Sequence, residues 1–287
     1  MNVRITVVVE NTATEEGTLA EHGLAYWIEC GSRRVLFDCG QGKTLEVNAD
    51  KLGIPLETAA AIVLSHGHYD HSGGLATALR QSPACTVFAH PAALRPKYGR
   101  GDHGVVKEIG IPASSQQAMR DASDRWVKTQ EPTPVLGGLV VTGPIPRETD
   151  FEDTGGPFFL DRDFQHPDPL VDDQALFFRT DRGTVVLLGC AHAGVVNTLR
   201  YIAALTEDAP IRAVLGGMHL IRASEERLKR TVGEFRQRGM ECLGPAHCTG
   251  DKAVATIRHE LPERCVACHV GSHFEFSVAP LDVASGE

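Results

Sequence analysis

The sequence of 287 residues lacks any run of about eighteen consecutive apolar residues, the length that a membrane-spanning helix needs. Its first ten residues hold an apolar stretch that is too short for a signal-peptide core, and no cleavage site of small residues follows. We therefore expect a cytoplasmic protein that does not interact with membranes. In that compartment the eight cysteines are expected to be reduced thiols and not disulfides.

Positive charge is also scarce. The chain has 28 Lys and Arg residues against 37 Asp and Glu, which gives a net charge of -9. Proteins that bind nucleic acid through general attraction to phosphates carry basic surfaces, so we expect no nucleic-acid partner. A Walker-type phosphate loop is missing too, because Gly73-Gly74 does not belong to such a run. No pattern indicates an oligomeric state, and a small molecule is the expected ligand.

What the sequence does contain is a regular alternation of strands and helices. Hydrophobic residues make up 42% of the chain, enough for a sizeable core. The patterns predict strands at 3–9, 24–30, 35–38, 59–64, 86–89, 139–142, 175–179, 184–188, 211–215, 242–244 and 274–278, and helices at 43–52, 72–81, 195–205, 224–238 and 252–260. Strands followed by helices recur in two successive halves, which indicates one α/β domain over 1–287 with αββα layering.

One long segment departs from this alternation. Residues 91–172 are rich in Pro and Gly, and within them only 139–142 has a clear strand pattern. A long segment of weak periodicity inside a domain is usually a lid or a binding loop. We therefore predict a lid-like insertion at about 91–172 that covers the site.

Side chains that could bind a metal are concentrated in the run from Ser65 to His71, between a predicted buried strand and a predicted helix that Ser72 caps. His66 and His68 flank Gly67, so a tight turn can aim two imidazoles at one point, while Asp70 and His71 can reach a second point nearby. Imidazole and carboxylate ligands suit zinc, with iron or manganese as alternatives. Three His and one Asp in six residues at a strand end argue against a surface loop that is His-rich by chance.

Two divalent ions at such points would lower the pKa of a shared water and make it a hydroxide nucleophile near neutral pH. Asp70 would orient or deprotonate that water and is a candidate catalytic residue.

The pattern His-x-His-x-Asp-His after a strand resembles the signature of the metallo-β-lactamase superfamily. Further segments resemble the branch of metal-dependent hydrolases that includes the archaeal dihydropterin ribofuranosylaminobenzene-phosphate synthase; they lie at 9–11, 21–24, 37–40, 65–75, 142–147, 189–194, 216–220 and 245–250. The resemblance covers nearly the whole chain. It implies a metallo-β-lactamase αββα sandwich, a site for two divalent metal ions, and additional ligands late in the chain.

The resemblance implies that His192 and His247, each after a strand, complete the ligand set. Many relatives have Gly-Asp where this chain has Gly189-Cys190. Cys190 is therefore either a thiolate ligand or a small buried side chain. A carboxylate from Asp172 or Asp173 is a further alternative, as is a turn role for that pair.

His219 follows two glycines at a strand end, and we predict that it faces the site as a ligand or as a catalytic acid-base group. Asp38 and His22 also lie beside strand ends. We interpret Asp38 as a group that orients a ligating histidine, with a strand-end cap as the alternative. His22 is placed with it, as a supporting residue or a further ligand.

Basic residues in the insertion suggest an anionic substrate. Arg147 ends the run Gly-Pro-Ile-Pro-Arg, in which two prolines stiffen the backbone and would aim its guanidinium inward. Arginine suits bidentate binding of phosphate or carboxylate. The alternative is an exposed Arg147 that pairs with Glu148 or Glu152. The insertion also holds Arg95, Lys97 and Arg100.

Cys265, Cys268 and His269 match the spacing of a c-type haem attachment site. We reject a haem because no export signal is present, and we expect the two cysteines to fill a core strand.

Three functions remain. The first is hydrolysis of an ester, lactone or phosphoester. The second is metal-dependent group transfer of the dihydropterin synthase type, which joins an arylamine to a pterin with loss of pyrophosphate. The third is a non-catalytic sensor of a small ligand. A redox diiron enzyme normally needs a flavin domain, for which the chain is too short.

Overall fold

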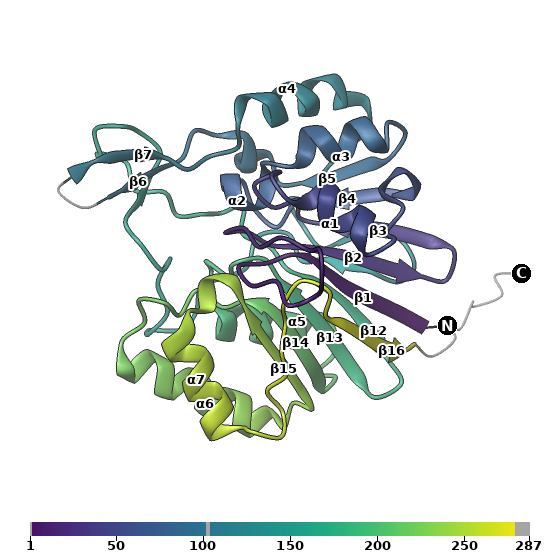
Figure 1. Cartoon of the computed structure of the whole chain (residues 1–287). Helices are drawn as coiled ribbons and strands as arrows, with labels where there is room; N and C mark the ends of the chain where they lie inside the picture. The colour runs from purple at the N-terminus through teal and green to yellow at the C-terminus, as the bar shows by residue number, and fades with distance from the viewer. Residues whose placement is uncertain (1, 102–103, 279–287) are drawn as a thin grey trace, which may run out of the picture.

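Two β-sheets face each other through the centre of the molecule, and helices cover the outer face of each (Figure 1). The structure is a computed structural model that describes residues 2–101 and 104–278, so residues 1, 102–103 and 279–287 of the predicted domain lie outside it. This arrangement is the αββα sandwich that the sequence predicts. Among the described residues, no helix has the length and apolar character needed to cross a membrane.

The first sheet has the strand order β16-β1-β2-β3-β4-β5-β8. Its strands are β1 (Asn2–Val9), β2 (Ala25–Cys30), β3 (Arg33–Phe37), β4 (Ala61–Val63), β5 (Thr86–Ala89), β8 (Trp126–Lys128) and β16 (His273–Ser277). The helices α1 (Leu45–Lys51), α3 (Leu75–Gln81) and α4 (Ala113–Asp121) supply apolar side chains to the core on its outer face. Both faces of the sheet are buried, which explains the nearly continuous apolar runs of β1 and β2.

The second sheet has the order β15-β14-β13-β12-β10-β9. Its strands are β9 (Thr133–Pro134), β10 (Val140–Val141), β12 (Leu176–Thr180), β13 (Gly183–Leu188), β14 (Ile211–Gly217) and β15 (Cys242–Ala246), and its outer face packs on α5 (Val195–Leu205), α6 (Glu225–Arg238) and α7 (Asp251–Glu260). Ser224 caps α6 by accepting a hydrogen bond from the Arg227 N–H, and Gly239 ends it in the left-handed conformation, as the sequence predicts.

Parallel pairing determines where the loops meet. Strand β3 pairs in parallel with β4, and β13, β14 and β15 are parallel neighbours in the other sheet. The carboxyl ends of parallel strands lie at one edge of a sheet, so the loops after these strands gather at one edge of the sandwich. Gly189, just after β13, lets the backbone approach the loop after β4 closely, because a Cβ there would collide with the Ser65 side chain.

The segment 91–172 is more regular than its sequence pattern predicts. Strands β6 (Tyr98–Arg100), β7 (Val106–Glu108) and β11 (Phe158–Phe159) form a separate three-stranded sheet, and α4, β8, β9 and β10 also lie in this segment. These strands have two or three residues each, too few for an alternating pattern to be recognised. The β6–β7 hairpin projects from the body of the molecule beside the site edge (Figure 1).

Two local predictions are wrong. Ser72 does not cap a helix over 72–81; it ends the short helix α2 (Tyr69–Ser72), and its hydroxyl donates a hydrogen bond to the His68 carbonyl. Helix α3 begins separately after Gly74. Cys265 and Cys268 do not lie in a core strand either. Cys265 forms only an isolated bridge with Leu243, although both cysteines pack against the hydrophobic cores.

Four 3-10 turns complete the described elements: η1 (Leu56–Thr58), η2 (Pro91–Leu94), η4 (Ser123–Arg125) and η5 (His247–Thr249).

Candidate metal centre

The loops at the site edge bring together the histidines that the sequence singles out. His66 and His68 follow β4, Asp70 and His71 lie in α2, His192 follows β13, His219 follows β14, and His247 begins η5 directly after β15. All except His219 are buried, and His219 is partly buried.

Three of these side chains form a first group. His66 Nε2 lies 3.0 Å from His68 Nδ1, and His192 Nε2 lies 3.2 Å from the same atom. One ring nitrogen from each residue therefore points to a common position, at the separation expected for ligands of one ion. His68 Nε2 is buried and has no hydrogen-bond partner among the described residues.

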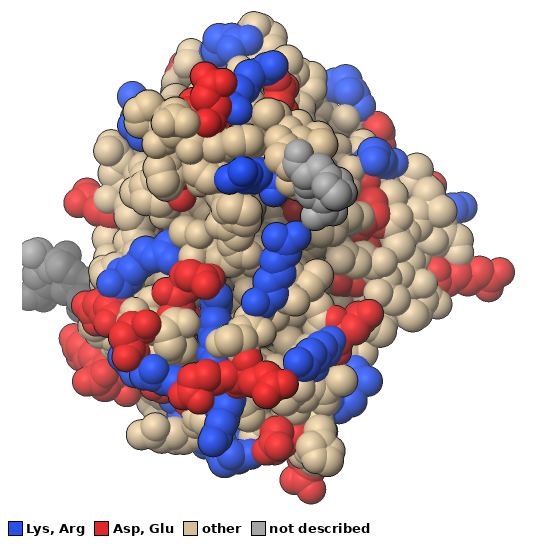
Figure 2. All heavy atoms as spheres, turned by 90° about the vertical axis from the view of Figure 1, so that its left-hand side faces the viewer, with Lys and Arg blue, Asp and Glu red and all other residues tan. Residues whose placement is uncertain are grey.

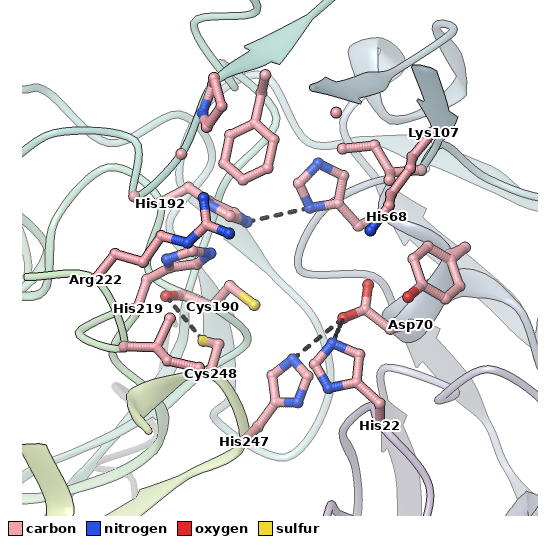
Figure 3. Close-up of a pocket in the computed structure, with 18 of the residues that line it drawn as sticks. His22, His68, Asp70, Lys107, Cys190, His192, His219, Arg222, His247 and Cys248 are labelled. Atoms are coloured by element: carbon pink, nitrogen blue, oxygen red, sulfur yellow. Dashed lines mark hydrogen bonds and ion pairs between the residues drawn. The ribbon is translucent and has the colours of Figure 1, made fainter. Parts of the chain in front are cut away.

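A second group is centred on Asp70 and lies beside the first. Asp70 Oδ2 is 3.3 Å from His247 Nε2 and 3.9 Å from His71 Nε2, and the two histidine nitrogens are 3.2 Å apart. His22 is more exposed, yet its Nε2 lies 3.2 Å from the same carboxylate oxygen. Figure 3 shows His22 and His247 both pointing to Asp70 from the lower side of the pocket.

Cys190 lies between the two groups. Its Sγ is 3.1 Å from His71 Nε2, and it also forms a possible ligand set with His192 and His219. The thiol therefore lies between the two groups, at the sequence position where the resemblance implies an Asp. Burial raises the pKa of this thiol well above its ordinary value, so the metal-free protein holds it protonated.

Each of four histidines uses Nδ1 for a contact outside the group and directs Nε2 toward the centre. Those outer contacts are His66 to Ser65 Oγ at 2.9 Å, His71 to Asp38 Oδ2 at 2.7 Å, His192 to the Thr154 carbonyl at 2.8 Å, and His247 to Asn11 Oδ1 at 2.9 Å. Asp38 also accepts hydrogen bonds from the Ser65 backbone and hydroxyl. Such outer contacts fix the orientation of a ligating imidazole.

The protonation states suit a cation. Burial lowers the pKa of His68 to about 3 and that of His247 to about 4, so both rings are neutral at pH 7. Burial alone would raise the pKa of Asp70, but the neighbouring His71 and the hydrogen bonds from His22 and His247 lower it well below its ordinary value. Neutral imidazoles beside an ionised carboxylate are the donor states that a divalent metal requires.

His71 differs from the other histidines. Burial would lower its pKa, but the carboxylates of Asp38 and Asp70 outweigh that effect and raise it to about 9. In the metal-free protein His71 is therefore a cation at pH 7, and it lies between the carboxylates of Asp38 and Asp70.

The backbone at these strand ends is strained. Asp38, Ala191, His219 and His247 have positive φ values of 60°, 54°, 44° and 50°, which side chains other than glycine rarely adopt. Such conformations cost free energy and persist where the surrounding structure enforces them, commonly at functional sites. Here the turns direct the side chains that follow β3, β13, β14 and β15 toward one edge.

Both groups open into one pocket of about 410 Å³ (Figure 3). Phe158 and Ile221 supply apolar lining, and His219 lies beside His192 with a ring separation of 4.4 Å. Burial lowers the pKa of His219 to about 4. This ring is therefore neutral at pH 7 and faces the space that a substrate would fill.

Three basic side chains line the pocket: Arg100 and Lys107 from the β6–β7 hairpin, and Arg222 from the loop after β14. Lys107 and Arg222 stand on opposite sides of it (Figure 3). Among the described residues none of the three forms an ion pair or a side-chain hydrogen bond, although Arg100 stacks on Phe164. Figure 2 faces this side of the molecule, where most acidic side chains gather in the lower half.

Contrary to the expectation from the sequence, Arg147 does not point into the metal pocket. The stiff Pro-Ile-Pro segment turns Ile145 into the core under the second sheet, and Arg147 falls on the exposed surface, where it lines a neighbouring shallow pocket. The alternative ion pair with Glu148 or Glu152 is not formed either. Glu152 instead accepts hydrogen bonds from the first amides of α5.

Two other basic residues of the insertion, Lys97 and Arg95, do not line the metal pocket either. Lys97 is buried and bonds to Asp168 and Asp172, and Arg95 lies outside the lining of the metal pocket. Sequence reasoning missed Lys107 and Arg222. Lys107 lies on a strand too short to be recognised, and Arg222 belongs to no motif.

Comparisons with known proteins agree with this arrangement. Residues 19–226 match the family model described as the metallo-beta-lactamase superfamily. The 7,8-dihydropterin-6-methyl-4-(β-D-ribofuranosyl)-aminobenzene-5′-phosphate synthase of Methanocaldococcus jannaschii is 27% identical, with 96% of this chain and 97% of that protein covered. An uncharacterized protein of the same archaeon is 33% identical over 88% of this chain and 93% of its own length.

Among solved structures, Tm1679, described as a metal-dependent hydrolase of the β-lactamase superfamily, is 30% identical. It has a TM-score of 0.80 and covers 96% of this chain and 99% of its own.

Proposed function

Because the chain belongs to the metallo-β-lactamase superfamily, we propose that it is a metal-dependent hydrolase that cleaves an ester, lactone or phosphoester of an anionic small molecule. The observation that carries the proposal is the pair of adjacent ligand groups that open into one pocket. Fold alone does not determine the reaction, so the proposal rests on these side chains.

Two divalent ions fit the donors. His66, His68 and His192 would hold one ion, and Asp70, His71 and His247 the other. Nitrogen-rich groups with a thiol at Cys190 favour zinc, with iron or manganese as alternatives. When bound, such ions supply a Lewis-acid charge that stabilises developing negative charge and lowers the pKa of water.

The protein's own groups would divide the remaining work. Asp70 is ionised and can accept a hydrogen bond from the attacking water, which orients it. His219 is neutral and faces the pocket, so it can accept a proton or hydrogen-bond the leaving group. Asp38 would keep the His71 ring in place through the 2.7 Å contact at Nδ1.

The basic side chains support an anionic substrate. Arg100, Lys107 and Arg222 line the pocket without a carboxylate partner among the described residues, in a chain whose net charge is -9. A phosphate or carboxylate held by these groups would place the rest of the substrate over the two ligand groups. These side chains take the role that the sequence assigned to Arg147.

A substrate panel tests the proposed reaction. Protein of measured metal content is assayed against phosphodiesters, phosphomonoesters, lactones and carboxylic esters, before and after chelation and after metal is restored. We expect turnover of at least one anionic member, lost on chelation and regained with the metal. Tight binding of panel members without turnover, in fully loaded protein, would favour the non-catalytic sensor.

Group transfer is the second candidate. It is favoured by the full-length match to the archaeal synthase, which is itself named for a product carrying an aminobenzene and a phosphate. The two reactions differ in their acceptor. If an arylamine added to the metal-loaded protein together with a pterin diphosphate yields a coupled product and pyrophosphate, while no ester or lactone is cleaved, transfer replaces hydrolysis.

A further inference from the structure

A buried tripeptide, Asp172-Asp173-Gln174, connects the two loops that carry the first histidine group. It lies at the end of the insertion, shortly before β12, and all three residues are at most 2% exposed. The Asp172 carboxylate accepts a hydrogen bond from the Gly67 N–H at 2.8 Å. Gly67 is the residue between His66 and His68, so this bond holds the turn that separates the two imidazoles.

The next residue holds the other loop. Asp173 Oδ2 accepts a hydrogen bond from the Ala193 N–H at 2.8 Å, directly after His192. Gln174 adds two bonds to the first loop, donating its backbone N–H to the Ser65 carbonyl and its side-chain amide to the Leu64 carbonyl. Successive residues of one segment therefore fix the backbone on both sides of the first group.

A lysine from the far end of the insertion completes this arrangement. Lys97 is 2% exposed and donates to Asp172 Oδ1 at 2.7 Å and to Asp168 Oδ2 at 2.9 Å. Both oxygens of Asp172 are thus in use, one by Lys97 and the other by Gly67. Because each oxygen has its own partner, the carboxylate is held in a single orientation. Removal of one partner of this buried ion pair would leave an uncompensated charge.

We propose that Asp172 and Asp173 are positioning residues for the first metal ion and that Lys97 makes this depend on the folding of the insertion. The inference rests on the proposed metal centre, since it assigns His66, His68 and His192 to one ion. The two carboxylates belong to none of the candidate ligand groups of the described residues; they set the spacing of the three imidazoles through backbone amides. Replacing such outer contacts typically lowers metal affinity by about 10–100-fold.

Asp172→Asn tests the proposal with almost no change in shape. An asparagine offers one acceptor oxygen in place of two, and Lys97 will take it, so the amide NH₂ faces the Gly67 N–H. Asp168→Asn is the matched control. Asp168 is also buried, binds the same Lys97 Nζ and accepts the Leu170 N–H at its other oxygen, but it does not contact the metal loops.

The probe is Co²⁺, titrated into metal-free protein and followed by visible absorption and calorimetry. His192→Ala lacks one ligand of the first group and His247→Ala lacks one ligand of the second, so the two variants assign the spectral bands to the two ions. We expect Asp172→Asn to lower the affinity of the first ion about 10–100-fold and to shift its absorption bands, with the second ion unchanged. Asp173→Ala should do the same, and Asp168→Asn should match the wild type at both ions.

Equal loss of affinity in Asp168→Asn would show a general effect of the buried charge and overturn the proposal, as would wild-type affinity and bands in Asp172→Asn. A wild-type protein that binds no Co²⁺ would contradict the proposed function itself, and the inference with it.

Discussion

Metal binding should release a proton from His71. The Asp38 and Asp70 carboxylates overcome the effect of burial and raise the pKa of His71 to about 9, so the metal-free protein carries this proton at pH 7. An ion at Nε2 needs a neutral ring, and the proton must leave. His68 and His247, with pKa values of about 3 and about 4, are already neutral and release none.

The pKa of His71 determines how strongly the metal affinity depends on pH. At pH 7, about two units below the pKa of His71, removing the proton costs about 2.7 kcal/mol, which is roughly a hundredfold in affinity. The apparent affinity of the second ion should therefore rise about tenfold per pH unit between pH 7 and pH 9 and become level above that.

Calorimetric titration with Zn²⁺ in buffers of different ionisation enthalpy measures the number of protons that the protein releases when the metal binds. Asp38→Asn removes the carboxylate that lies 2.7 Å from His71 Nδ1, which lowers the pKa of this histidine. The variant should release about one proton fewer than the wild type at pH 7. Because Cys190 is unchanged in the variant, any proton from its thiol cancels in the comparison. Equal proton release by the two proteins would refute the reasoning.

Two further predictions follow from the charges of the site. Lys107→Met and Arg222→Met should each lower kcat/KM on the best anionic substrate by about 10–150-fold, chiefly through KM, because each removes a charged hydrogen bond of about 1.5–3 kcal/mol; Arg147→Met is the control outside the pocket, and an equal effect there would contradict the assignment. The metal-free protein should lose stability as pH falls below about 6.5, because the folded pKa values of His68, His219 and His247 are lowered to about 3 or 4 and the unfolded chain therefore binds protons first. Each of these histidines contributes a slope of roughly 1.4 kcal/mol per pH unit to the free energy of unfolding. Asp173, with its pKa raised by burial to about 7, opposes one of these histidines. Urea unfolding between pH 4.5 and pH 7 measures the slope, and a flat profile would refute it.

The long elements and the first motif were predictable because their signals are local. Strands of five or more residues buried on both faces read as apolar runs, and α6 carries its own start and stop signals in Ser224 and Gly239. The spacing of His66, His68, Asp70 and His71 reads directly from the sequence. His192 and His247 follow strands of the second sheet and reach the first motif because the two sheets face each other. His71 and His247 are in contact although 176 positions of sequence separate them, and only a family resemblance could suggest such a contact.

The features that the sequence did not reveal have separate causes. The insertion is built from strands of two or three residues, so neither β6 nor β7 has a readable period, and the basic side chains on them could not be placed. Arg147 was misplaced because two prolines restrict the backbone without telling which neighbour turns inward, and Ile145 is the one that does. Asp172 and Asp173 accept hydrogen bonds from backbone amides of distant loops, and Asp172 also pairs with Lys97, contacts that no local sequence pattern indicates.

The central claim is that two adjacent groups of side chains each hold one divalent ion. Elemental analysis of zinc-loaded and dialysed protein tests it most directly, with His192→Ala and His247→Ala beside the wild type and circular dichroism to confirm folding. We expect about two ions per chain in the wild type and about one in each variant, since each substitution removes one ligand from a different group. Wild-type protein that retains no metal after loading, or variants that both retain two ions, would contradict it.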